Sequence, residues 1–140
     1  MKLTNVSLAL LLTITYLSCS CPECFSPPNP FMFELVDQDG NNLLTSEGID
    51  QDVLKVEDSE EREIAYERVS DHILINTIGW ETEMVTLLFK DGDNLLFELF
   101  VDAERTSEDC CEFTVYKSIE VIGADFIQDS STDIYRVVIE

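Results

Sequence analysis

The sequence predicts an all-β protein built from antiparallel strands. Most of the chain after residue 30 consists of short runs in which apolar and polar residues alternate, which is typical of strands with one buried face. Turn-forming residues separate these runs at regular spacing, and no long segment has the 3.6-residue period of an amphipathic helix. We therefore expect seven to nine short strands in a single domain over residues 31–140.

The first strands are expected between the prolines and the middle of the chain. Residues 31–36 (FMFELV) alternate and then enter the turn-rich segment 37–42 (DQDGNN). Residues 52–56, 63–68 and 72–76 are further short candidates. Asp58 with Glu61 three residues later also fits a helix start, so residues 58–68 could form one helix instead.

The clearest strand signal is a hairpin formed by residues 83–90 and 95–101. Asp-Gly between two β-rich runs is a strong hairpin signature. A two-residue loop would set Val85 opposite Glu98, so we expect a three-residue loop, 91–93. The side chains expected to face the core are Val85, Leu87, Phe89, Leu95, Phe97, Leu99 and Val101.

Residues 112–121 (EFTVYKSIEV) predict a half-buried strand, and 134–139 predict the last one, after a loop over 128–133. The expected inward residues of 112–121 are Phe113, Val115, Ile119 and Val121, and the expected outward ones are Glu112, Thr114, Tyr116, Ser118 and Glu120. This pattern favours an antiparallel β-sandwich of immunoglobulin-like or transthyretin-like type, with a small barrel as the alternative.

Residues 1–18 have the features of an export signal. Lys2 precedes an uncharged run from Val6 to Leu17, which is too short to span a membrane permanently because a spanning helix needs roughly 20 apolar residues. The segment Leu17-Ser18-Cys19-Ser20 resembles a bacterial lipobox, which implies cleavage before Cys19 and lipid on that residue. A secretory cut after Ser20 also fits. Residues 19–30 contain all four prolines of the chain, so we expect an extended tether or a stiff edge there and ordered structure from about Phe31.

The charge is strongly negative, with 29 acidic residues against 8 basic ones. Such a surface repels phosphate backbones and anionic headgroups, so we expect no nucleic-acid partner and membrane contact through the N-terminal lipid alone. The ordinary explanation of the acidity is solubility outside the cell.

The cysteines favour disulfides. If Cys19 carries lipid, an even set of four remains in an oxidising compartment: Cys21, Cys24, Cys110 and Cys111. A Cys110–Cys111 bond would close a strained ring, so we expect at least one bridge from the first pair to the second. A zinc site made by the four is disfavoured because exported thiols oxidise.

Other residues carry weaker signals. Asp37 and Asp39 lie in an acidic loop, but Gly40 and Gly48 do not fit the calcium-binding pattern, so a plain turn is the better interpretation and the two are weak cation ligands at most. The only histidine, His72, is expected at the start of an apolar strand, as a strand-end residue rather than a catalytic base. No cofactor is expected.

The layout of lipobox, proline-rich segment, FMFELVDQDGNNLL, DGDN hairpin and Cys-Cys pair before EFTVYKSIEV resembles small exported lipoproteins of unknown function from Bacteroidota. The resemblance implies a sandwich in an outer envelope location, with Ser20 after the lipidated cysteine consistent with the outer membrane, and it supplies no catalytic residue to carry over. We expect a lipid-anchored protein with a non-enzymatic binding or structural role toward a protein or glycan. The alternatives are secretion without lipid, an envelope glycan hydrolase using paired carboxylates, and a thiol redox protein using Cys21 and Cys24.

Overall fold

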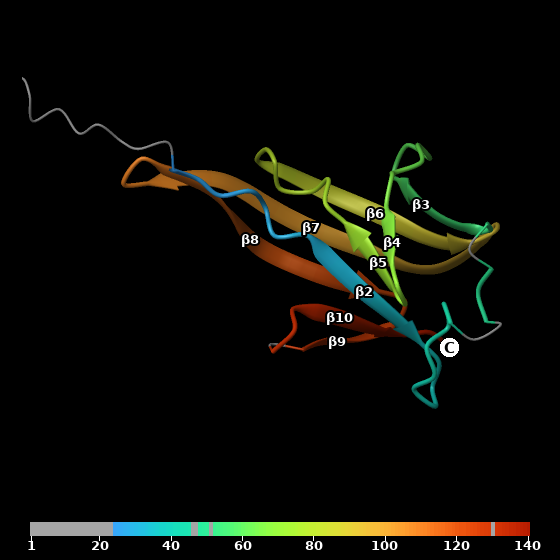
Figure 1. Ribbon diagram of the computed structural model, residues 1–140. Coiled ribbons are helices and arrows are strands. Elements are labelled where there is room, and N and C mark those ends of the chain that lie inside the picture. Colours follow the sequence, from blue (N-terminus) through green and yellow to red (C-terminus); the bar gives the residue numbers. More distant parts are fainter. Residues whose placement is uncertain (1–23, 46–47, 51, 130) are drawn as a thin grey trace, which may run out of the picture.

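The computed structural model describes residues 24–45, 48–50, 52–129 and 131–140. Its described part contains ten strands and no helix, so the predicted all-β class is confirmed (Figure 1). The strands are β1 (Cys24–Phe25), β2 (Phe31–Val36), β3 (Leu54–Asp58), β4 (Glu67–Val69), β5 (His72–Ile75), β6 (Glu83–Asp91), β7 (Asn94–Glu108), β8 (Cys111–Ile122), β9 (Asp125–Asp129) and β10 (Ile134–Val138).

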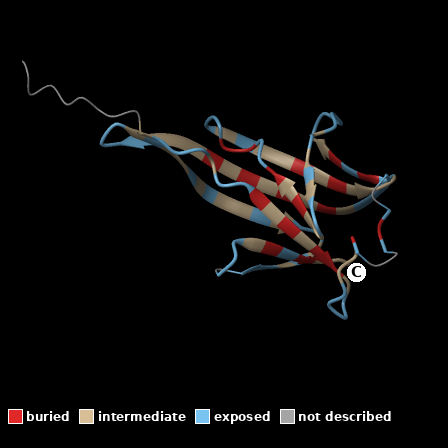
Figure 2. Cartoon of the chain, in the orientation of Figure 1, coloured by how far each residue is buried: buried red, intermediate tan, exposed pale blue. Residues whose placement is uncertain are grey.

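The strands form two five-stranded sheets that pack face to face. Sheet A has the order β1-β8-β7-β6-β3, and sheet B has the order β4-β5-β2-β10-β9. Alternate residues of each central strand point into the core, as the period of two predicts. Phe33 from sheet B packs edge-on against Phe89 of sheet A, with 5.4 Å between ring centroids, and Phe89 stacks on Phe97 at 4.2 Å. Figure 2 shows buried residues along the middle of both sheets.

Both sheets are mixed, whereas the sequence pattern predicts antiparallel pairing throughout. β10 lies between β2 and β9, parallel to β2 and antiparallel to β9. β1 is parallel to β8 at the other end of the molecule. Pairing between strands far apart in the sequence leaves no local turn signal, which is why alternation alone did not indicate it.

The β6–β7 hairpin differs from the prediction in its loop but not in most of its buried side chains. Asp91 pairs with Asn94, so the loop consists of the two residues 92–93 rather than the three residues 91–93. A β-bulge at Leu96 then shifts the register, so that Leu87 faces Leu99 and Val85 faces Val101. Without the bulge, Val85 would face Phe100 and Leu87 would face Glu98. Leu95, predicted to be inward, is 51% exposed.

A second bulge changes the facing of β8. Asp102 pairs with Ser118 and Ala103 with Tyr116, so Lys117 is the extra residue. Beyond this bulge the alternation reverses, and the predicted facing of Tyr116 and Val115 is wrong. Tyr116 packs edge-on against Phe31 with 4.9 Å between ring centroids, while Val115 is 40% exposed.

Three other segments depart from the expected element boundaries. The alternative helix over 58–68 is absent, because the chain turns at 59–62 and β4 follows as a strand of only three residues. Residues 125–129, of which the last two were expected in a loop, form β9. The described structure begins with β1 at Cys24 rather than near Phe31.

β7 and β8 are the longest strands, and their connected ends extend past sheet B as an arm made of residues 104–115 (Figure 1). Residues 24–30 run along this arm toward β2, and we call them the strap. The C-terminus lies at the opposite end of the molecule. The strap and the arm therefore bring the first described residues to one end of the sandwich.

Candidate functional site

A disulfide joins the strap to the arm. Cys24 is bonded to Cys111, with 4.5 Å between the Cα atoms and a sequence separation of 87. The backbone amide of Ser26 also donates to the carbonyl oxygen of Glu112 at 2.9 Å, so the described part of the predicted tether forms a stiff edge. The expected bridge from the N-terminal cysteines to the later pair is thus confirmed for Cys24 and Cys111.

The remaining cysteines are placed as follows. Cys19 and Cys21 lie outside the described residues. Cys110 is not a free thiol. It occupies the two-residue turn between β7 and β8 together with Asp109, and both residues have positive φ angles, 48° at Asp109 and 70° at Cys110.

Arg105 of β7 ties the arm to the strap. Its Nη1 donates to the carbonyl oxygen of Ser26 at 2.8 Å and to Oγ1 of Thr114 at 2.9 Å. The guanidinium carbon lies 4.7 Å from the ring centroid of Phe25, within the range of a cation–π contact, and Nη2 lies 3.9 Å from a carboxylate oxygen of Glu112. The Arg105 guanidinium therefore contacts the strap at the Ser26 backbone and the Phe25 ring, and it contacts β8 at Thr114 and Glu112.

The 76–82 loop closes over the same part of the arm. Gly79 has a φ of +92°, and a Cβ at this position would lie 2.9 Å from both the Thr114 methyl and the Tyr116 hydroxyl. Thr114 donates to the carbonyl oxygen of Gly79 at 2.5 Å, and Tyr116 donates to that of Asn29 at 2.9 Å. Burial raises the pKa of Tyr116 to about 12, because the charged phenolate would lose its hydration there.

An aromatic pair covers this junction. Phe25 of the strap stacks on Trp80 of the 76–82 loop, with 6.0 Å between ring centroids and 26° between ring planes. The indole nitrogen of Trp80 donates to the carbonyl oxygen of Asn76 at 2.8 Å. Phe25 is still 54% exposed and Trp80 50% exposed, so the two rings form an apolar surface whose polar atom already has a partner.

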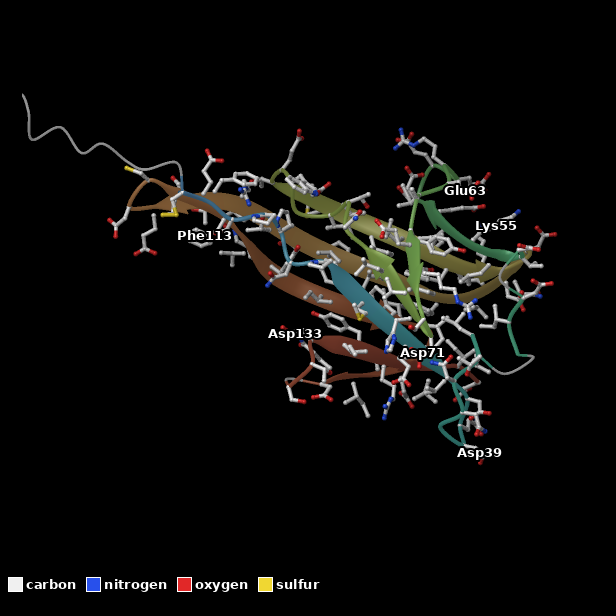
Figure 3. All side chains as sticks on the ribbon, viewed as in Figure 1. Asp39, Lys55, Glu63, Asp71, Phe113 and Asp133 are labelled. Atoms are coloured by element: carbon white, nitrogen blue, oxygen red, sulfur yellow. A yellow bond between two sulfur atoms is a disulfide. The ribbon has the colours of Figure 1, made fainter. Side chains whose placement is uncertain are left out.

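The two acidic residues considered as cation ligands lie in a closed turn. Asp37 accepts from the backbone amides of Asp39 and Asn41 and from the Asn41 side chain, at 2.8–2.9 Å. The bond from the Asn41 side chain is the largest cause of the lowered pKa of Asp37. Asp39 lies at the end of this loop, away from both sheets (Figure 3). Nowhere in the described ranges do three or more His, Cys, Asp or Glu residues gather as a metal site would require.

His72 begins β5, as expected, and lies on the outer face of sheet B. Its Nδ1 is 2.7 Å from a carboxylate oxygen of Asp71. It borders a hollow of about 540 Å³ in that face, where Arg136 donates through Nε to Glu34 at 2.7 Å. His72 and Arg136 therefore each lie beside a carboxylate, that of Asp71 and that of Glu34.

The described residues offer no arrangement typical of a glycoside hydrolase. No described carboxylate is buried, and every described carboxyl with a resolved pKa shift, including Asp58, has its pKa lowered. Asp58 and Glu83 line one hollow of about 290 Å³. Asp58 accepts from the backbone amide of Arg62, which lowers its pKa, whereas a general acid needs a raised pKa. Glu83 accepts from the backbone amide of Gly79.

A redox motif would require a bond within the C-x-x-C pair. Cys24 is bonded instead to Cys111, and the described residues that follow it contain no helix of the kind found in thiol oxidoreductases. The bond that Cys24 makes in the described structure therefore joins the strap to the arm.

The strap–arm junction was not found from the sequence apart from its disulfide. Arg105 and Trp80 carried no motif, and Tyr116 was assigned to the wrong face. The one available signal was the presence of a single arginine in a long acidic strand, and this does not indicate its partners.

Comparison with protein families, curated proteins and solved structures finds no match. The likeness to immunoglobulin or transthyretin sandwiches and to Bacteroidota lipoproteins therefore stays a prediction from the sequence. Among the described residues, no helix has the length and apolar character needed to cross a membrane.

Proposed function

We propose that this chain is an exported, lipid-anchored protein of the cell envelope with a non-enzymatic binding or structural role. The Cys24–Cys111 disulfide carries the proposal, because structural disulfides form in oxidising compartments outside the cytoplasm. The proposal also uses the lipobox-like segment Leu17-Ser18-Cys19-Ser20. Ser20 after the anchored cysteine favours the outer membrane as the destination.

The strap supports the anchoring role. A lipid on Cys19 would be attached five residues before Cys24, which is bonded to the arm. Pulling on the lipid would therefore load the disulfide and the long β7–β8 ladder rather than a loose terminal segment. This arrangement suits a domain that is held at a surface by one end.

The chemistry of the described residues supports a role without catalysis. The acidic side chains whose pKa values are lowered, Asp37, Asp58 and Asp129, accept hydrogen bonds within their own turns. The cationic side chain of Arg105 binds the strap, and that of Arg136 pairs with Glu34. These contacts hold turns and neighbouring segments of the sandwich together, as a binding or structural role requires.

Mass analysis of the membrane-extracted protein tests the proposal. We expect acyl chains on a mature N-terminal peptide that begins at Cys19, and we expect Cys19→Ala to leave the precursor uncut. Cys21→Ala is the matched control, because it removes a cysteine two residues away and should still be processed and lipidated. An unmodified mature protein that begins at Cys21 would contradict lipid anchoring and favour the secreted alternative.

A further inference from the structure

The Phe25–Trp80 stack is an exposed aromatic surface at the strap. Phe25 also contacts Arg105, yet Phe25 and Trp80 each remain about half exposed as residues. The indole N–H is already bonded to the Asn76 carbonyl, so the exposed part of the pair presents carbon surface. Rings in such a setting gain free energy when an apolar medium covers them.

The position of the stack relative to Cys19 limits what can cover it. Only residues 20–23 separate Cys19 from Cys24, and Phe25 comes next. A fully extended chain over this distance reaches at most about 18 Å. If Cys19 carries lipid, which is the proposed function on which this inference rests, the stack is held close to the membrane surface.

We propose that the Phe25–Trp80 stack inserts into the headgroup layer of the membrane that holds Cys19 and binds zwitterionic lipid there. Tryptophan is enriched at membrane interfaces because its ring is largely apolar and its N–H is polar. A lipid chain with a second contact anchors a protein more firmly than one chain alone. The protein then contacts the membrane through this stack as well as through the lipid on Cys19, whereas its acidic composition predicts contact through the lipid alone.

Charge around the stack favours zwitterionic over anionic lipid. Glu81 follows Trp80 directly and is exposed, and the Glu112 side chain beside Arg105 is 63% exposed. These carboxylates repel anionic headgroups, whereas phosphatidylcholine presents no net charge. We therefore infer that the stack binds a membrane surface whose lipids carry no net charge.

Trp80 is the only tryptophan in the chain, so its fluorescence reports on the stack without labelling. The lipidated full-length protein is incorporated into phosphatidylcholine vesicles, with and without bromine on the acyl chains. We expect the Trp80 emission to lie at shorter wavelength than in the urea-unfolded protein, to be quenched by the brominated lipid, and to resist quenching by iodide in the water. Replacing half of the lipid with anionic phosphatidylglycerol should weaken the bromine quenching, and added salt should restore it.

Two variants make the test specific. Phe25→Ser removes the stacking partner and should reduce the bromine quenching of Trp80. Ile127→Ser is the matched control, because Ile127 is an apolar side chain 64% exposed on β9 of the other sheet, and it should leave the quenching unchanged.

Several outcomes overturn the inference. A protein that carries acyl chains and floats with the vesicles, while Trp80 is quenched by iodide and not by bromine, overturns this inference and leaves lipid anchoring intact. A protein without acyl chains that does not float overturns both. Loss of iodide access on self-association in detergent-free buffer, without bromine quenching in vesicles, would show that a second copy of the chain covers the stack.

Discussion

Replacing Gly79 with alanine should destabilise the domain more than the same change at another glycine of similar backbone geometry. Gly79 and Gly40 both have φ angles in the left-handed region, +92° and +82°. A non-glycine residue held there costs about 1–2 kcal/mol. This conformational cost applies to both positions.

The surroundings of the two glycines differ. A Cβ at Gly40 would meet nothing within 4 Å, whereas one at Gly79 would lie 2.9 Å from Thr114 Cγ2, 2.9 Å from Tyr116 Oη and 3.2 Å from Pro28 Cβ. Forcing an extra methyl group into packed surroundings typically costs about 1–3 kcal/mol. We therefore expect Gly40→Ala to lose only the conformational part, and Gly79→Ala to lose about 2–5 kcal/mol in total.

Urea unfolding of the oxidised protein measures the difference. With a denaturant slope of about 1–3 kcal/mol per molar for a domain of this size, the two midpoints should be separated by roughly 1 M. Equal midpoints for Gly79→Ala and Gly40→Ala would refute the close approach of the 76–82 loop to the arm. A larger loss for Gly40→Ala would refute it as well.

Three further results are expected. Phe97→Ala, which empties a fully buried site stacked on another ring, should cost about 3–5 kcal/mol in urea unfolding, while Glu120→Ala on the outer face of β8 should stay within about 0.5 kcal/mol; similar losses would contradict the facing assigned here. Tyr116→Phe should make the free energy of unfolding less dependent on pH between pH 10 and 12. The contribution of the raised pKa of Tyr116 to stability is fully present below the unfolded pKa of 10, and it disappears as the pH rises through about 12. A variant whose stability has the same pH dependence as the original protein would argue against a buried Tyr116 hydroxyl. Replacing Cys24, Cys110 and Cys111 together with serine, so that no disulfide remains at the β7–β8 turn, should lower stability by about 4 kcal/mol in the chain-entropy model. Calorimetry that finds no difference would show that cross-linking at this turn does not constrain the unfolded chain.

The sequence predicted the fold class well because alternation reports directly on which face of a strand is buried. Leu87, Phe89 and Phe97 are buried as the pattern indicated, and β6, β8 and β10 lie within a residue or two of their expected ranges. The disulfide between the N-terminal and later cysteines followed from ring strain and from an even number of thiols. These features depend on local residue type and spacing.

The errors occur where a strand depends on its partner. A bulge such as those at Leu96 and Lys117 inserts one residue against a neighbouring strand, and the sequence of one strand does not show where the ladder slips. Tyr116 therefore changed face although its strand was predicted correctly. The strap–arm junction was missed for a related reason, because Arg105 contacts Ser26 across 79 residues of sequence.

The place of β10 in sheet B has a consequence for the order in which the chain can fold. β10 lies between β2 and β9 and pairs Ile134 with Met32, so neighbours in this sheet come from nearly opposite ends of the described sequence. Closing so long a loop is slow, because the entropy is lost before the new contacts form. Until the last strand emerges from the ribosome, β2 lacks a partner on one side and β9 lacks its partner in sheet B. The nascent chain therefore stays incompletely folded through most of its synthesis, which is the condition in which a polypeptide can still be threaded through a narrow channel.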